Sequence, residues 1–143
     1  MRKKKKLRKI SKLIDEVASI AKEYVRLRES DSCGYVKCYT CDSAPVYYKG
    51  EGMHTRHFIH GKYKQTYLDE KNMEPQDCAC NTYKNGNLAT YAYNHIRKYG
   101  PEIIEYLELK SKKIWTPTRE ELAELKELYT IKLKQQEDIR SLR

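Results

Sequence analysis

The sequence contains no long hydrophobic run. Hydrophobic residues make up 39% of its 143 residues, and charged residues make up 34%. No window approaches the roughly 18 apolar residues that a membrane-spanning helix requires, so we expect no membrane partner. The basic start, MRKKKKLRK, continues into charged residues instead of an apolar stretch. We therefore expect no secretory signal and a cytoplasmic location.

The sequence contains only five cysteines, an odd number. In a reducing compartment the five cysteines are not expected to form disulfides, and closely spaced pairs are better explained by metal binding. A bound metal would also stabilise a chain whose low hydrophobic content limits its core. The odd count leaves at least one free thiol, for which Cys33 is the first candidate.

Basic residues exceed acidic ones, giving a net charge of +9, and the excess lies at one end. Residues 1–28 carry 11 Lys and Arg against 3 acidic residues, whereas residues 118–143 are neutral overall. A charge of this kind favours a polyanionic partner such as DNA. The run from Arg2 to Lys6 is too dense in charge for a core, so we expect an arm that DNA orders or a nuclear-localisation signal.

Apolar residues recur every three or four positions through residues 7–28, which predicts an amphipathic helix close to a heptad pattern. Its apolar face, from Leu7 to Val25, would pack either on the core of its own chain or against a second copy of the chain. The second alternative would make this helix the seam of a homodimer.

The remaining elements are β in the middle of the chain and helical after it. Residues 46–59 predict two strands on either side of a Gly-Glu-Gly turn, and residues 61–71 predict a loop. A helix should start at Asn81, be interrupted at residues 83–86 and resume over 88–99. Gly100 ends it, and Pro101 suits the first turn of a helix through Lys113. Thr118-x-x-Glu121 forms a capping box for a last helix.

This order of elements predicts an α+β fold in which a small β core is flanked by helices. We divide the chain into a basic arm with the amphipathic helix over residues 1–28, a core over 29–100, and C-terminal helices over 101–143.

Two short cysteine pairs enclose the central segment and predict a structural zinc site. Cys38-x-x-Cys41 is a strong half-site, because this spacing directs both sulfurs at one ion. The second half is weaker, since Cys78-x-Cys80 is one residue short and Asp77-x-x-Cys80 has the expected spacing. The fourth ligand is therefore either Asp77 or Cys78.

Between these pairs lie residues suited to cleaving a phosphodiester. The reaction needs a base that deprotonates water and a cation that stabilises charge on the phosphate and the leaving oxygen. We expect His57, on a strand, to face Asn81 at the start of a helix. An Asn and His ligand set implies Mg²⁺ or Mn²⁺ as the catalytic ion. His60 and His95 are expected to be solvated or to contact phosphate.

In chain order, the motifs MHTRHF, DEKN, PQDCACN, YKNGN and YGPE resemble the NinG/Rap family of phage recombination nucleases. The resemblance covers about residues 24 to 130. It implies a ββα-metal (HNH-like) nuclease core, and the layout is similar to that of T4 endonuclease VII. This resemblance implies that His57 is the general base and that Asn81 binds the catalytic metal. It also implies that Asn72 forms hydrogen bonds to backbone groups and so holds the histidine-bearing loop in place.

The sequence departs from the family pattern at two places. Asp77 occupies the position of the third zinc-binding cysteine. Arg56 occupies the position of a glycine or, in some relatives, of an acidic metal ligand. His54 would supply the missing ligand only if a bulge brought it to the face of the strand that carries His57, because residues three apart lie on opposite faces.

The function that these features predict is metal-dependent, structure-selective cleavage of branched DNA such as Holliday junctions, by a homodimer, in the cytoplasm of a phage host. Two alternatives remain: a zinc-containing DNA-binding protein without catalysis, and an HNH-type nickase of plain duplex DNA. Tyr63, Tyr67 and Tyr83 are candidates for stacking on unpaired bases. Basic side chains expected to contact DNA phosphates are Lys3, Lys4, Lys5, Lys6, Arg56, Lys62, Lys64 and Lys84.

Overall fold

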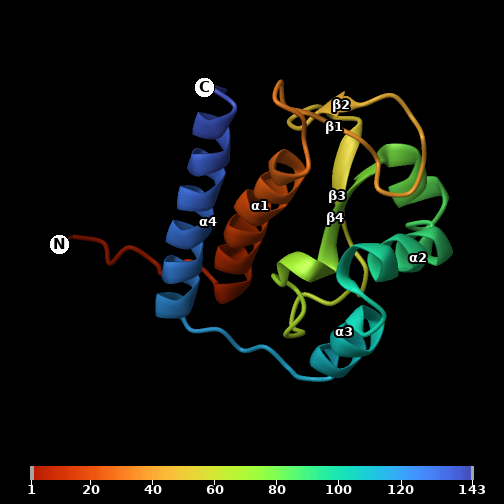
Figure 1. The fold of residues 1–143 in the computed structure, drawn as a ribbon. Coiled ribbons are helices and arrows are strands. Elements are labelled where there is room, and N and C mark those ends of the chain that lie inside the picture. Colours follow the sequence, from red (N-terminus) through yellow and green to blue (C-terminus); the bar gives the residue numbers. More distant parts are fainter. Residues whose placement is uncertain (1, 143) are drawn as a thin grey trace.

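The computed structural model of the chain describes residues 2–142, and Figure 1 shows its arrangement. The fold is α+β, with two small antiparallel sheets among the helices. The elements in chain order are α1 (Ile10–Arg28), β1 (Tyr35–Val36), β2 (Val46–Tyr47), β3 (Met53–His57), η1 (Glu70–Asn72), β4 (Met73–Asp77), η2 (Ala79–Tyr83), α2 (Leu88–Tyr99), α3 (Ile103–Ser111) and α4 (Arg119–Ile139).

The first and last helices lie side by side, with α1 between α4 and the strands (Figure 1). The apolar face of α1 is buried, and Val17 and Ala21 are among the residues that form the core. Leu122 and Tyr129 of α4 close this core from the other side. The same chain therefore covers the face that the sequence offered as a dimer seam. Leu7 lies before the helix and is 75% exposed.

The strand pairing differs from the predicted hairpin. Residues 46–59 do contain two strands, β2 and β3, but these do not pair with each other. Short β2 pairs with β1, and β3 pairs with β4 in an unbroken antiparallel register from Met53↔Asp77 to His57↔Met73. Residues 73–77 were assigned to no element from the sequence; they form β4, although Pro75 cannot donate to a ladder. A two-stranded sheet accommodates it, since each strand is an edge.

The second half of the chain follows the predicted order. A single π-helical turn, η2, holds Cys80 and Asn81, and α2 starts after the interruption at residues 84–87. Gly100 ends α2 with a φ of 99°, and α3 begins two residues after Pro101. Thr118 and Glu121 form the predicted capping box of α4.

Charged side chains fasten β4 between the helices. The Glu74 carboxylate is fully buried and accepts a hydrogen bond from Lys98 Nζ of α2 at 2.8 Å. Arg28 Nη2 of α1 lies 3.7 Å from the same oxygen, which also accepts a hydrogen bond from the Tyr99 hydroxyl at 3.2 Å. These contacts fix the β3–β4 sheet between α1 and α2. Within residues 2–142, no helix is long and apolar enough to cross a membrane.

Candidate functional site

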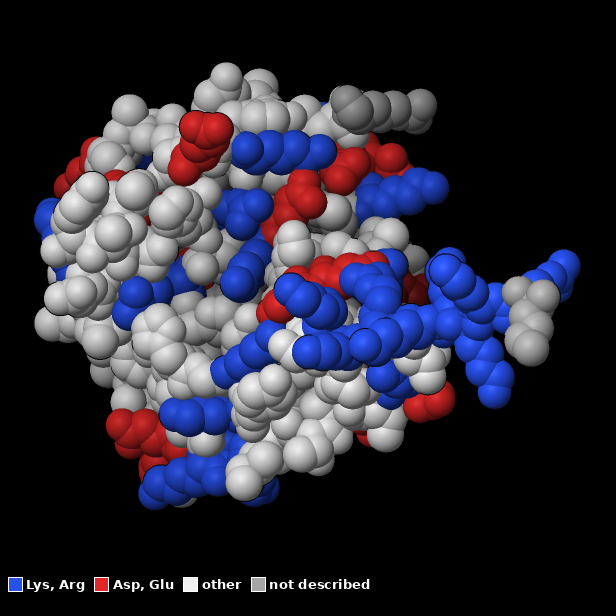
Figure 2. Space-filling view, turned by 180° about the vertical axis from the view of Figure 1, so that it is seen from behind, with Lys and Arg blue, Asp and Glu red and all other residues white. Residues whose placement is uncertain are grey.

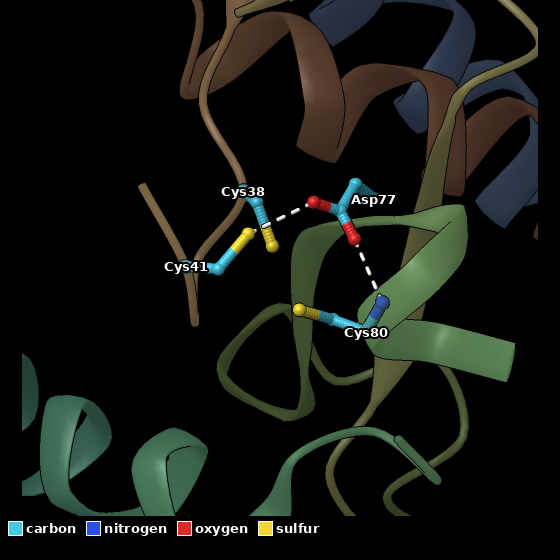
Figure 3. Close-up of side chains that lie close together, drawn as sticks. All are labelled: Cys38, Cys41, Asp77 and Cys80. Atoms are coloured by element: carbon cyan, nitrogen blue, oxygen red, sulfur yellow. Dashed lines mark hydrogen bonds between the residues drawn. The ribbon is translucent and has the colours of Figure 1, made fainter. Parts of the chain in front are cut away.

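Three cysteines and one aspartate converge beside the end of β4, as Figure 3 shows. Cys38 and Cys41 come from the loop between β1 and β2, Asp77 ends β4, and Cys80 lies in η2. Their ligand atoms all lie within 4.8 Å of one another, although the two halves are 36 or more residues apart in sequence. Three thiols and a carboxylate in one place could hold a metal ion such as zinc.

Asp77 connects the two halves of this cluster. Its Oδ1 accepts a hydrogen bond from the backbone N–H of Cys80 at 2.7 Å, which shapes the start of η2. Its Oδ2 lies 2.9 Å from Cys41 Sγ and accepts a bond from Ser43 Oγ at 2.7 Å. Burial opposes ionisation, but the hydrogen bonds from Cys41, Ser43 and Cys80 prevail and lower the pKa of Asp77. The residue therefore presents a carboxylate to the site.

Cys78 does not join the cluster, although it was one of two candidates for the fourth ligand. Its sulfur lies toward Thr82, 3.9 Å from Oγ1 of that residue. Figure 3 shows the Asp77 side chain directed toward the three cysteines, whereas Cys78 is not among the clustered ligands. Burial raises the pKa of the Cys80 thiol to about 12, so a cation is needed to keep this sulfur ionised. Cys33 is exposed and lies outside the cluster.

His57 ends β3 with its ring almost fully buried at 7% exposure. Nε2 lies 2.8 Å from the Tyr67 carbonyl, which can only accept, so Nε2 carries the proton and Nδ1 keeps its lone pair. The ring stacks on that of Tyr67, with centroids 4.8 Å apart and planes 7° apart. Burial lowers the pKa of His57 to about 4, so the imidazole is neutral at pH 7.

This burial predicts a specific loss of stability in acid. The unfolded histidine takes up a proton near pH 6.5, whereas the folded one takes it up near pH 4. Stability from this residue is therefore present above pH 6.5 and lost as pH falls toward 4, by on the order of 3 kcal/mol. Urea unfolding at pH 7 and pH 4.5 should show a smaller fall for His57→Gln than for the parent. Burial also lowers the pKa of the more exposed His60, but less strongly, so His60→Gln should keep most of the parental fall. Equal falls in all three proteins would contradict the assignment.

Asn72 holds the loop that runs from β3 to β4. The side chain is fully buried, its Oδ1 accepts from the Ile59 N–H at 2.9 Å, and its Nδ2 donates to the Ile59 carbonyl at 2.9 Å. Nδ2 also donates to the Thr66 carbonyl at 3.1 Å. Three bonds from one amide thus join the two ends of the loop, next to the Tyr67 carbonyl that orients His57.

Asn81 contacts His54 and Arg56 of β3, not His57. Its Nδ2 lies 2.8 Å from His54 Nδ1, and its Oδ1 accepts from Arg56 Nη1 at 3.3 Å. The unbroken register of β3 contains no bulge, so His54 and His57 lie on opposite faces. The expected pairing of His57 with Asn81 is therefore replaced by a pairing of His54 with Asn81.

Arg56 lies on the face of β3 that carries His54, beside Asn81. Its guanidinium donates to the carbonyl of Asn81 and, from Nη2, to that of Asn85 at 3.4 Å. Gly86, with a φ of 83°, leaves it room, since a Cβ there would lie 2.7 Å from Cζ of Arg56. The Nε of Arg56 is buried and has no hydrogen-bond partner within residues 2–142. The cation thus occupies the place where an acidic metal ligand was considered.

The other predicted residues are distributed around these two faces. Lys3 to Lys6 and Lys84 are exposed, and Lys64 is half-buried. Lys62 donates to Ser11 and pairs with Asp15 at 2.6 Å, which fastens the loop to α1. Tyr63 and Tyr83 are exposed, whereas Tyr67 packs on His57.

His95 is fully buried, contrary to the prediction that it is solvated or contacts phosphate. It lies between the Tyr39 hydroxyl and the Lys71 carbonyl, so it is a structural residue. Sequence reasoning also missed Ser43 and the Tyr67 carbonyl, because neither a serine in a loop nor a backbone oxygen carries a sequence signal.

Comparison with known proteins gives one match. The family model described as "Bacteriophage Lambda NinG protein" matches residues 1–138 of this chain. No curated protein and no solved structure matches it.

Proposed function

The chain belongs to the bacteriophage lambda NinG protein family, and from this premise we propose that it is a metal-dependent endonuclease that cuts branched DNA during phage recombination. The observation that supports catalysis best is the state of His57. Its Nε2 donates to the Tyr67 carbonyl, and its neutral Nδ1 has no partner among the hydrogen bonds of residues 2–142. A fixed, neutral imidazole is suited to taking a proton from water.

The proposed mechanism assigns one task to each side chain. His57 Nδ1 accepts the proton of the attacking water, while the Tyr67 carbonyl keeps the ring in its tautomer. Asn72 maintains this geometry by fixing the loop. A phosphate beside the ring would raise the pKa of His57 from about 4 toward the range useful for a base.

The proposed catalytic ion would be Mg²⁺ or Mn²⁺, held by Asn81 and His54. The amide oxygen and the imidazole nitrogen of these two residues are ligand types that such ions accept, and the two side chains are already in contact. Because His54 and His57 lie on opposite faces of β3, the ion and the base would serve the same phosphate only if bound DNA brings the two side chains to one edge of the strand. There the ion would stabilise negative charge on the phosphate and the leaving oxygen. In the cysteine cluster, Zn²⁺ would be structural, since all four donors come from the protein.

One gel assay tests this proposal. Labelled four-way junction and linear duplex are each incubated with the protein in Mg²⁺, Mn²⁺ or EDTA. Symmetric, metal-dependent cuts in the junction support junction resolution, and equal nicking of the duplex would indicate the duplex nickase instead. Binding without metal-dependent cleavage would mean that the protein is not a nuclease.

The second candidate function is that of a zinc-containing DNA-binding protein without catalysis, and the position of Arg56 favours it. The guanidinium donates to Asn81 Oδ1, the atom that would bind the catalytic ion. A protein of this kind would bind DNA and retain the cysteine-bound zinc without cutting. Arg56→Gly, which resembles the family pattern, should then leave cleavage undetectable, whereas a nuclease in which Arg56 competes with the ion should cut faster.

His57→Ala is expected to reduce cleavage by about 10²- to 10⁴-fold, because it removes the proposed base. Binding to the junction in EDTA and the zinc content should remain those of the parent. His60→Ala, which removes an exposed imidazole three residues away, is the matched control and should cut normally. Activity retained in His57→Ala at matched metal would exclude His57 from the mechanism.

Cutting both strands of a junction requires two active sites, so we propose that the protein acts as a homodimer on DNA. The contact would lie outside the apolar face of α1, which α4 covers. Sedimentation of the protein with and without junction tests this, and a stable monomer in both conditions would count against it.

A further inference from the structure

Lys22 and Arg26 lie one turn apart on the side of α1 that contacts β3. The Thr55 hydroxyl donates to the Lys22 carbonyl at 2.8 Å and accepts from Arg26 Nη1 at 3.0 Å. Arg26 Nε also donates to the Tyr48 carbonyl at 2.7 Å. These bonds hold the Arg26 side chain and the backbone of Lys22 at the junction of α1 and β3, where both residues are half-buried.

No carboxylate within residues 2–142 forms an ion pair with either side chain, although the molecule has eleven other such contacts. Like charges four residues apart destabilise a helix. Burial lowers the pKa of Lys22, and the charges of Arg26 and Lys62 lower it further, with only Asp15 opposing them. The charges of Asp15 and Glu23 offset part of the cost of burying Lys22 and Arg26, but neither carboxylate forms an ion pair with them within residues 2–142.

The same pair lies beside His57. Thr55 and His57 are two residues apart on β3, so their side chains share the face that contacts α1 and are separated by about 7 Å. The charge of Lys22 contributes to the low pKa of His57, after burial. Lys62, paired with Asp15 of α1, lies near the same stretch of the helix. Positive charge therefore gathers at the proposed base.

Basic side chains are numerous on one face of the molecule (Figure 2). Seen from behind, Lys and Arg side chains extend from the N-terminal arm onto the body of the molecule, with acidic side chains beside them (Figure 2). The arm itself contributes exposed Lys3 to Lys6. A polyanion lying along this surface would pass from the arm to α1.

We propose that Lys22 and Arg26 bind a backbone phosphate of the DNA beside His57. An anion there offsets the repulsion between the two cations, and Arg26 is already oriented by Thr55 and Tyr48. The contact positions the strand and reads no sequence. The identity of the ligand as DNA rests on the proposed function. Lys22 and Arg26 are positioning residues, since the proton transfer belongs to His57.

The test compares Lys22→Gln with Lys134→Gln in the chain of residues 1–143. Lys134 is an exposed lysine of α4 without an ion pair among residues 2–142, so the control makes the same change in charge elsewhere. Binding of labelled four-way junction is measured in EDTA at several salt concentrations. Lys22→Gln should weaken binding about 3- to 10-fold and lower the salt slope by about 1. Lys134→Gln should match the parent, and Lys22→Arg should restore most of the affinity.

Thermal unfolding separates this role from a structural one. Because the substitution removes an unpaired, half-buried charge, Lys22→Gln should melt at the parental temperature or above it. A lower melting temperature, or parental binding and salt slope, would overturn the proposal. If the parent binds the junction without cutting it and Lys22→Gln still weakens binding, the nuclease proposal fails and the phosphate site stands. If Lys22→Gln binds and cuts as the parent does, the phosphate site fails and the nuclease proposal stands.

Discussion

Replacing Cys38 or Cys80 by serine is expected to abolish metal binding and to unfold the middle of the chain. Both sulfurs are buried in the cluster, and β1 and β2, which carry the first half-site, pair over only two residues each. Structural zinc in small domains contributes on the order of 10 kcal/mol to folding. The variants should contain less than one tenth of the parental zinc by mass spectrometry, and EDTA should lower the melting temperature of the parent toward theirs.

Two further substitutions serve as controls and settle the ligand set. Cys78→Ser and Cys33→Ser should retain one zinc per chain, because neither sulfur belongs to the cluster. Asp77→Asn should weaken zinc retention, since it removes the fourth anionic donor and one of the two oxygens that accept from Ser43 and Cys80. Zinc lost from Cys78→Ser but kept by Asp77→Asn would reverse the assignment of the fourth ligand.

Asn72→Ala is expected to lower the free energy of unfolding by about 3 kcal/mol. The substitution removes three hydrogen bonds and leaves the N–H and carbonyl of Ile59 and the carbonyl of Thr66 without their partner. Urea unfolding at pH 7 measures the change. Because the loop also carries the carbonyl that orients His57, cleavage of the junction should fall with it.

Asn94→Ala is the matched control for this prediction. Asn94 donates one hydrogen bond, from Nδ2 to the Tyr39 carbonyl at 2.8 Å, and lies away from the loop. Loss of this hydrogen bond should lower the free energy of unfolding by about 1 kcal/mol and leave cleavage unchanged. If Asn72→Ala costs no more than Asn94→Ala, the buried amide does not hold the loop.

The sequence by itself determined the features that depend on near neighbours in the chain. The three- to four-residue period from Ile10 to Val25 gave α1, because burial of one helical face requires that spacing. Thr118 and Glu121 determined the start of α4, since a capping box needs only two residues three apart. Cys38-x-x-Cys41 identified one half of the metal cluster for the same reason.

Only the tertiary structure decided which distant segments meet. β3 pairs with β4 and not with β2, and local propensity contains no information on that choice because it describes each segment separately. Asp77 and not Cys78 enters the cluster, since the direction of each side chain depends on the register of β4. Burial of the apolar face of α1 by α4, instead of by a second chain, depends on a contact across about a hundred residues that no local pattern encodes. The same reason separates His57 from Asn81: an unbroken strand alternates its side chains, and only the pairing with β4 shows that it is unbroken.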